Sequence, residues 1–131
     1  MPPTFEFAIH GERLAIARLP ADAPVPPWAQ GPFVNIARTA TELSIVCAER
    51  HVPPGVQHER DRVAFGIAGT VPMTTVGILA SLCGALAAAG VPVFVLSTYD
   101  TDWLLVPAAR FAAARGALAG LGHSFTGAPP A

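Results

Sequence analysis

The sequence contains no lysine and is poor in charge of either sign. Its eight positive residues are all arginines, its acidic residues number nine, and only 13% of its 131 residues are charged, against about 25% in an average protein. No basic stripe is present, which argues against nucleic acid or an anionic membrane surface as a partner. Because 52% of the residues are hydrophobic, the chain has little polar surface. A homodimer or higher homo-oligomer is therefore expected.

Charge is completely missing between Arg62 and Asp100. Residues 76–96 are long enough to span a bilayer, which takes roughly 20 apolar residues. Gly90 and Pro92 interrupt this stretch, however, so a buried helix followed by a strand is predicted, and no membrane span. The apolar run at residues 5–9 is short and contains Glu6, unlike a signal peptide. A cytoplasmic location is expected.

The residues that carry most enzyme chemistry are few and scattered. Cys47 and Cys83 lie in apolar runs, where a cysteine is usually a small core residue. The four histidines lack the close spacing of metal ligands: His10, His51, His58 and His123. No nucleophile–base set and no glycine-rich phosphate loop is recognisable. We predict a protein that is not an enzyme, without a metal or another cofactor.

The second half of the chain reads as an alternation of strands and helices. Residues 63–67 alternate bulky and small side chains, as a strand does. An apolar helix is predicted over 76–89, with Thr74 or Thr75 as its N-cap and Gly90 just past its end. The continuous apolar run at 91–98 predicts a central strand.

A hairpin and a second helix complete this half. Residues 99–101 form a turn, and residues 102–106 return as the partner of strand 91–98. Pro107 opens a second helix, and residues 123–125 are a last short strand. The predicted order is therefore strand, helix, strand, strand, helix, strand.

The first half echoes the second. "RLAI" at 13–16 resembles "RVAF" at 62–65, and "TELSIV" at 41–46 resembles "TDWLLV" at 101–106. A proline-rich crossing at 20–27 replaces the first helix, and residues 33–38 and 43–48 form a hairpin. Residues 50–60 read as a linker. We predict two related units, a degenerate one at 1–60 and a complete one at 61–131.

Two segments of the sequence resemble a known family. "VGILASLCGALAAAGVPVFVLSTYDTDWLLVP" at 76–107 and "RTATELSIVCAE" at 38–49 resemble segments of the ACT-domain family. The subgroup in question is that of small bacterial two-ACT proteins similar to the CASTOR-type cytosolic arginine sensors. The resemblance implies an α+β fold of two tandem ACT-like units with antiparallel sheets. Each is a ferredoxin-like βαββαβ module, and the first is degenerate.

The resemblance also implies a ligand site in the cleft between the two units. The residues that it assigns to ligand binding are Ser44, Ile45, Thr74, Thr75, Val76, Gly77, Thr98, Tyr99 and Asp102. Ser44 and Ile45 would offer backbone groups. The arginine sensors carry an acidic residue in the loop before the helix, whereas this chain has Thr74 and Thr75 there.

The residues themselves suit a free α-amino acid. A helix that begins near Gly77 would favour binding of the ligand's carboxylate at its N-terminus, and the side chain of Asp102 suits the ligand's ammonium. Asp100 reads as a turn residue, and so does Glu42, which occupies the position equivalent to Asp102 in the first unit. Asp102 could bind a ligand or cap the turn, because aspartate is disfavoured at the start of a strand.

Two functions follow from these observations. The first is a non-catalytic regulatory protein, a sensor that binds a small molecule such as an amino acid and signals through the packing of its units or to an unknown protein partner. The alternative is a structural or protein-interaction module that acts by oligomerisation without a ligand.

Overall fold

The computed structural model describes residues 3–131, and the chain forms two compact units. The helical unit comprises the chain up to Gly11 together with Val63–Ala131, and the middle unit comprises Glu12–Arg62. The boundary predicted at residue 60 leaves the N-terminal residues with the first unit. Residues 3–11 belong to the helical unit instead, because their strand pairs within its sheet.

The helical unit has the predicted order of strands and helices. Its elements are the second half of β5 (Gln57–Ile67), α1 (Ile78–Ala88), β6 (Phe94–Ser97), β7 (Asp102–Pro107), α2 (Phe111–Ala119) and β8 (Ser124–Thr126). A 3₁₀ turn at Ala108–Arg110 leads into α2. The βαββαβ order is thus confirmed. Within residues 3–131, no helix is long and apolar enough to cross a bilayer.

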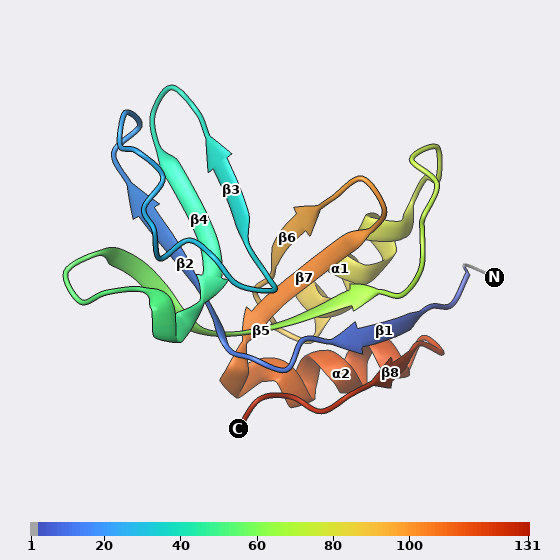
Figure 1. The fold of residues 1–131 in the computed structure, drawn as a ribbon. Helices are drawn as coiled ribbons and strands as arrows, with labels where there is room; N and C mark the ends of the chain where they lie inside the picture. The colour runs from blue at the N-terminus through green and yellow to red at the C-terminus, as the bar shows by residue number, and fades with distance from the viewer. Residues whose placement is uncertain (1–2) are drawn as a thin grey trace. The chain divides into compact units, whose positions relative to one another are not determined.

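An additional strand, β1 (Glu6–Ile9), lies between β5 and β8, so that the strand order is β8-β1-β5-β7-β6 (Figure 1). It runs antiparallel to β5, with Phe7 opposite Ile67, and parallel to β8, with Phe7 opposite Phe125. The sheet is therefore mixed at this position rather than antiparallel throughout. From the sequence, no strand is predicted at these residues.

Phe7 of β1 lies in the core of the helical unit and is fully buried. Its ring makes an edge contact with that of Phe65, at 5.3 Å between centroids, and packs against Phe125 at 5.1 Å. The same cluster contains α1 and α2 side chains, among them Leu86 and Leu118. Burial of a phenylalanine side chain contributes about 1.5–3 kcal/mol. The inserted strand is thus held by its side chains as well as by the sheet.

Two glycines with positive φ bound α1. Gly90, at φ +71°, follows the helix, and its N–H donates to Ala87 O while Val91 N–H donates to Leu86 O. This pair of bonds is a Schellman motif, so the predicted role of Gly90 is confirmed. The N-cap is Gly77 at φ +85°, with no side-chain capping bond. The prediction of Thr74 or Thr75 as N-cap is wrong, because the chain turns into the helix at Gly77.

The strand predicted at 91–98 is shorter and less central than expected. It spans Phe94–Ser97 as β6, and among the described residues it pairs with β7 alone. Val91 is buried, but as part of the helix-ending motif, and Pro92 lacks the N–H that a ladder requires. The predicted hairpin of β6 and β7 is confirmed, with Ser97 opposite Asp102.

The middle unit is a sheet in the order β3-β4-β2-β5, formed by β2 (Leu14–Leu19), β3 (Asn35–Arg38), β4 (Leu43–Ala48) and the first half of β5. A 3₁₀ turn at Glu49–His51 follows β4, and residues 20–34 contain no helix. Trp28 and Val34 pack against Ile45 and Cys47 in the core of this unit. The prediction that an irregular crossing replaces the helix is confirmed.

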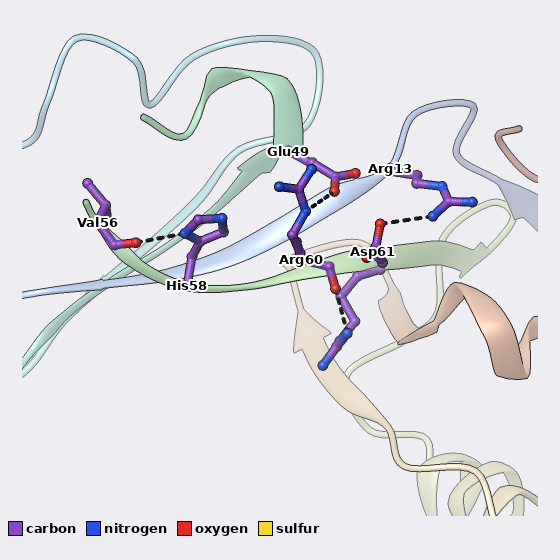
Figure 2. Close-up of polar contacts among 7 residues, drawn as sticks. Arg13, Glu49, Val56, His58, Arg60 and Asp61 are labelled. Carbon is purple, nitrogen blue, oxygen red and sulfur yellow. Dashed lines mark hydrogen bonds and ion pairs between the residues drawn. The ribbon is translucent and has the colours of Figure 1, made fainter. Parts of the chain in front are cut away.

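Charged residues of the middle unit pair along a strand that reads as a linker in the sequence (Figure 2). Arg60 Nε lies 2.8 Å from Glu49 Oε1, and Arg13 Nη1 lies 2.9 Å from Asp61 Oδ1. Asp61 has a positive φ of 61° at a register shift between β2 and β5, as in a β-bulge. The hydrogen bond from Arg13 holds the pKa of Asp61 below its usual value. These contacts allow a charged segment to form a strand.

Candidate ligand-binding site

A cavity of about 440 Å³ opens in the helical unit between two segments. One segment is the β6–β7 turn and its flanks, residues 97–102, and the other is the loop and first turn of α1, residues 71–80. Binding sites for small molecules typically measure about 300–1,000 Å³. The cavity is therefore large enough for a metabolite the size of an amino acid.

Six of the nine predicted site residues line this cavity. They are Thr75, Val76, Gly77, Thr98, Tyr99 and Asp102. Thr74 is exposed in the same loop but is not part of the lining. Ser44 and Ile45 belong to the middle unit, where their strand β4 pairs with β2 on one side and β3 on the other. The backbone of β4 thus forms hydrogen bonds with both neighbouring strands. A ligand-binding role for Ser44 and Ile45 stays a prediction.

Asp102 is placed in the cavity by the pleat of β7. Leu104 and Val106 are buried in the core of the helical unit. Since alternate residues of a strand share a face, Asp102 lies on the same side of the sheet as these two. Opposite it in the hairpin, Ser97 donates a hydrogen bond from Oγ to Asp102 Oδ1, at 2.6 Å. A carboxylate accepts several hydrogen bonds, so this contact leaves room for a ligand donor.

The N-terminal turn of α1 forms the opposite wall. The N–H of Ser81 bonds to Gly77 O, which closes the first turn of the helix. The N–H groups of Ile78, Leu79 and Ala80 precede that bond and have no partner four residues back in the helix. All three residues line the cavity. Donors of this kind, together with the helix dipole, favour an anion.

Hydrogen bonds fasten the loop before α1 to the β6–β7 turn. Val71 N–H donates to Asp100 O at 2.6 Å, and next to this bond Thr101 Oγ donates to the carbonyl of Ile67, the last residue of β5, at 2.7 Å. Asp100 takes part through its backbone and does not line the cavity, in agreement with its interpretation as a turn residue. The two walls of the cavity are thus held together by contacts that do not depend on a ligand.

Two polar lining residues were missed from the sequence, Ser97 and Thr101. The register of the β6–β7 hairpin is the signal that could have found them. When the turn is closed by residues 98 and 101, Ser97 lies opposite Asp102. Thr98 N–H donates to Thr101 O at 2.8 Å and closes this turn. The site therefore offers more hydroxyl groups around Asp102 than the sequence pattern alone assigns.

The cavity has one formally charged side chain, that of Asp102, among the described residues that line it. Most of the other lining residues are apolar, including Val71, Met73 and Leu79. The rim is open to solvent: Tyr99 is 82% exposed and Val76 is 91% exposed. The arrangement can bind a cationic group at Asp102 and an anionic group at the start of α1, with an uncharged body between them.

The cysteines and histidines in the described part of the chain offer no comparable chemistry. Cys47 is buried in the core of the middle unit, and burial raises the pKa of its thiol. The rings of His51 and His58 bond to the backbone carbonyls of Gln30 and Val56 (the latter in Figure 2). Within residues 3–131, no group of three or more His, Cys, Asp or Glu side chains is arranged to hold a metal ion.

Comparisons with known proteins identify the class of this fold. The family model described as the ACT domain matches residues 57–119, and a second model, of an N-terminal domain, matches residues 12–55. Protein Atu0741 from Agobacterium tumefaciens, known from a crystal structure, is 36% identical, with a TM-score of 0.90 over 95% of this chain and 94% of that one. No curated protein matches the chain. The chain belongs to the ACT-domain family.

More distant structures share the fold alone. A protein of unknown function from Vibrio cholerae, VC0802, titled a possible transport protein, has a TM-score of 0.70 at 14% identity, over 89% of each chain. The ligand-free regulatory subunit of aspartate kinase from Thermus thermophilus has a TM-score of 0.60 at 16% identity, over 87% of this chain and 94% of that one. The fold is thus the ferredoxin-type fold of tandem ACT regulatory domains, and a specific likeness to arginine sensors is not among these findings.

Proposed function

We propose that this protein is a non-catalytic regulatory protein that binds a free α-amino acid in the cavity of its helical unit. One observation carries the proposal: the cavity places the carboxylate of Asp102 and the N-terminal turn of α1 on facing segments of one 440 Å³ space. A free amino acid carries one cationic and one anionic group at a short separation.

The ligand's ammonium donates to Asp102, and its carboxylate accepts from the N–H groups of residues 78–80. Ser97 and Thr101 supply neutral oxygens for the remaining ammonium protons. A charge-assisted bond contributes about 1.5–3 kcal/mol, more than a neutral one. Because Asp102 is occupied by the ammonium, the cavity has no second charge for the ligand's side chain. We therefore propose an amino acid with an uncharged side chain.

The relatives support a regulatory role. Among the structures with the same fold is the regulatory subunit of aspartate kinase, an enzyme named for the amino acid aspartate. Regulation requires that the ligand favour one arrangement of the protein over another. In this chain, the loop before α1 is bonded to the β6–β7 turn without a ligand, and a ligand bound between Asp102 and the first turn of α1 would stabilise this arrangement further. A protein partner or a second copy would read that change.

Isothermal titration calorimetry against the common amino acids tests this proposal. Each amino acid that binds is compared with its N-acetyl derivative, which lacks the ammonium, and its amide, which lacks the carboxylate. Asp102→Ala is compared with Asp100→Ala, a matched control two residues away whose side chain lies outside the cavity lining.

The proposal predicts that an uncharged amino acid binds, that both derivatives bind at least about tenfold more weakly, and that only Asp102→Ala weakens binding. Binding that survives both derivatives would contradict the assigned recognition of the two ends. If no amino acid binds, the proposal is wrong, and the alternative, an interaction module that acts through oligomerisation, is favoured.

A further inference from the structure

The helical unit contains a second cavity, of about 220 Å³, on another side of the start of α1. Its walls come from the segment before β1, from residues 76–82 and from the residue before β8. The lining residues are Pro3, Phe5, Val76, Gly77, Ile78, Ser81, Leu82 and His123. Six of these eight are apolar or glycine, and Ser81 and His123 are the polar ones. The amino-acid site proposed above does not use this cavity.

His123 is 7% exposed, the one polar or charged residue among the buried residues of the described chain. Its Nδ1 accepts a hydrogen bond from the N–H of Phe5 at 3.0 Å, and its ring stacks on that of Phe5 with 5.7 Å between centroids. Desolvation lowers the pKa of the ring, so it is neutral near pH 7. A neutral imidazole whose Nδ1 accepts must carry its proton on Nε2.

These observations define a site with a distinct chemistry. An apolar cavity of about 150 Å³ is enough to bind benzene, so about 220 Å³ accommodates one ring with a small substituent. The cavity lining includes no charged residue, which disfavours an ion. His123 supplies one directional donor through Nε2–H, and a polar group bound beside it would need to accept that bond.

We propose that this second cavity is a binding site for a small, uncharged, mainly apolar molecule with one hydrogen-bond acceptor, and that His123 Nε2–H donates to that acceptor. The bond from Phe5 N–H fixes the tautomer and the orientation of the ring, and Phe5 itself forms part of the wall. The segment before β1 therefore builds one side of this site.

Acetophenone and isopropylbenzene are the probes, because they share size and ring but only acetophenone carries an acceptor. Two-dimensional ¹H–¹⁵N NMR spectra of the whole protein, including the imidazole nitrogens, follow each titration. Acetophenone should give saturable shifts at the amides of Ser81 and Leu82 and at the His123 ring. It should bind about 3- to 10-fold more tightly than isopropylbenzene, the ratio that one neutral hydrogen bond provides.

Three variants locate the site. Ser81→Leu fills the cavity and should abolish binding of both probes, whereas Ser81→Ala, the matched control, should retain it. His123→Asn keeps an acceptor near Phe5 N–H but removes the Nε2 donor, and should remove the preference for acetophenone.

Three results would overturn the proposal: no saturable shift in the wild-type protein with either probe, equal affinities for the two probes in the wild-type protein, or undiminished binding to Ser81→Leu. The first two need no variant, so a variant that fails to fold does not leave the proposal untested.

Discussion

The contact between Gly66 and Trp103 gives a sharp prediction about stability. A Cβ added at Gly66 would lie 2.6–2.8 Å from Cδ2, Cε3 and Cε2 of the Trp103 indole. Carbon atoms pack best at about 3.5–4.0 Å, so the ring or the strand would have to move by about 1 Å. Overpacking of this kind costs typically about 1–3 kcal/mol. We expect Gly66→Ala to lower the free energy of unfolding by that amount.

Urea denaturation followed by circular dichroism measures this change, and Gly84→Ala is the control. Gly84 is an exposed residue inside α1, and a Cβ there meets nothing within 4 Å. That substitution should stabilise the protein by about 0.5–1 kcal/mol. In the double variant Gly66→Ala/Trp103→Leu, the cost of the alanine should largely disappear, because the ring that it meets is gone. Equal effects of the two alanines, or a cost unchanged by Trp103→Leu, would refute the assigned contact.

Three further results are expected. Asp102→Ala should weaken amino-acid binding by about 10- to 150-fold, the equivalent of one charge-assisted hydrogen bond, while Asp100→Ala leaves the affinity measured by calorimetry unchanged. Burial lowers the pKa of His123. The neutral ring's contribution to the free energy of unfolding is therefore complete above the ordinary pKa of 6.5 and is lost as the pH falls through the folded-state pKa. Denaturation midpoints at several pH values should show this dependence, and His123→Asn should reduce it. Gly90 has φ +71°, so Gly90→Ala should lower the free energy of unfolding by about 1–2 kcal/mol. Gly116→Ala inside α2, where nothing lies within 4 Å of the added Cβ, should not lower it. An equal decrease in both variants would contradict the Schellman ending of α1.

Local signals in the sequence were enough to predict the order of elements in the helical unit. The alternation at residues 63–67, the apolar run ended by Gly90, and the turn at 99–101 each depend on neighbouring residues. The structure confirms all three. Such features follow from backbone geometry and side-chain periodicity, which a short window of sequence contains.

Strand β1 could not be predicted in this way, because its stability comes from distant parts of the chain. Residues 6–9 pair with residues 65–67 and 124–126, and the Phe5–His123 bond joins residues 118 positions apart. The charged start of β5 also depends on distant partners. Arg60 reads as a linker residue in the sequence, and only the structure shows that Glu49 pairs with it.

The candidate site was partly predictable. Asp102 stands out in the sequence because a carboxylate ends a long uncharged stretch, whereas Thr98 is assigned by the family resemblance alone; both line the cavity. The resemblance assigns Thr74 to the site and its capping propensity predicts an N-cap, yet Gly77 caps α1 and Thr74 lies outside the lining. Ser97 has no unusual signal of its own, and only the hairpin register places it beside Asp102.

A ¹H–¹⁵N NMR titration with the tightest-binding amino acid tests the central claim most directly. We expect saturable shifts concentrated at the amides of residues 77–80 and 97–102, with the largest changes at the N–H groups of 78–80 that receive the ligand's carboxylate. Shifts confined to residues 12–62, or no shift with any amino acid, would contradict the proposed site in the helical unit.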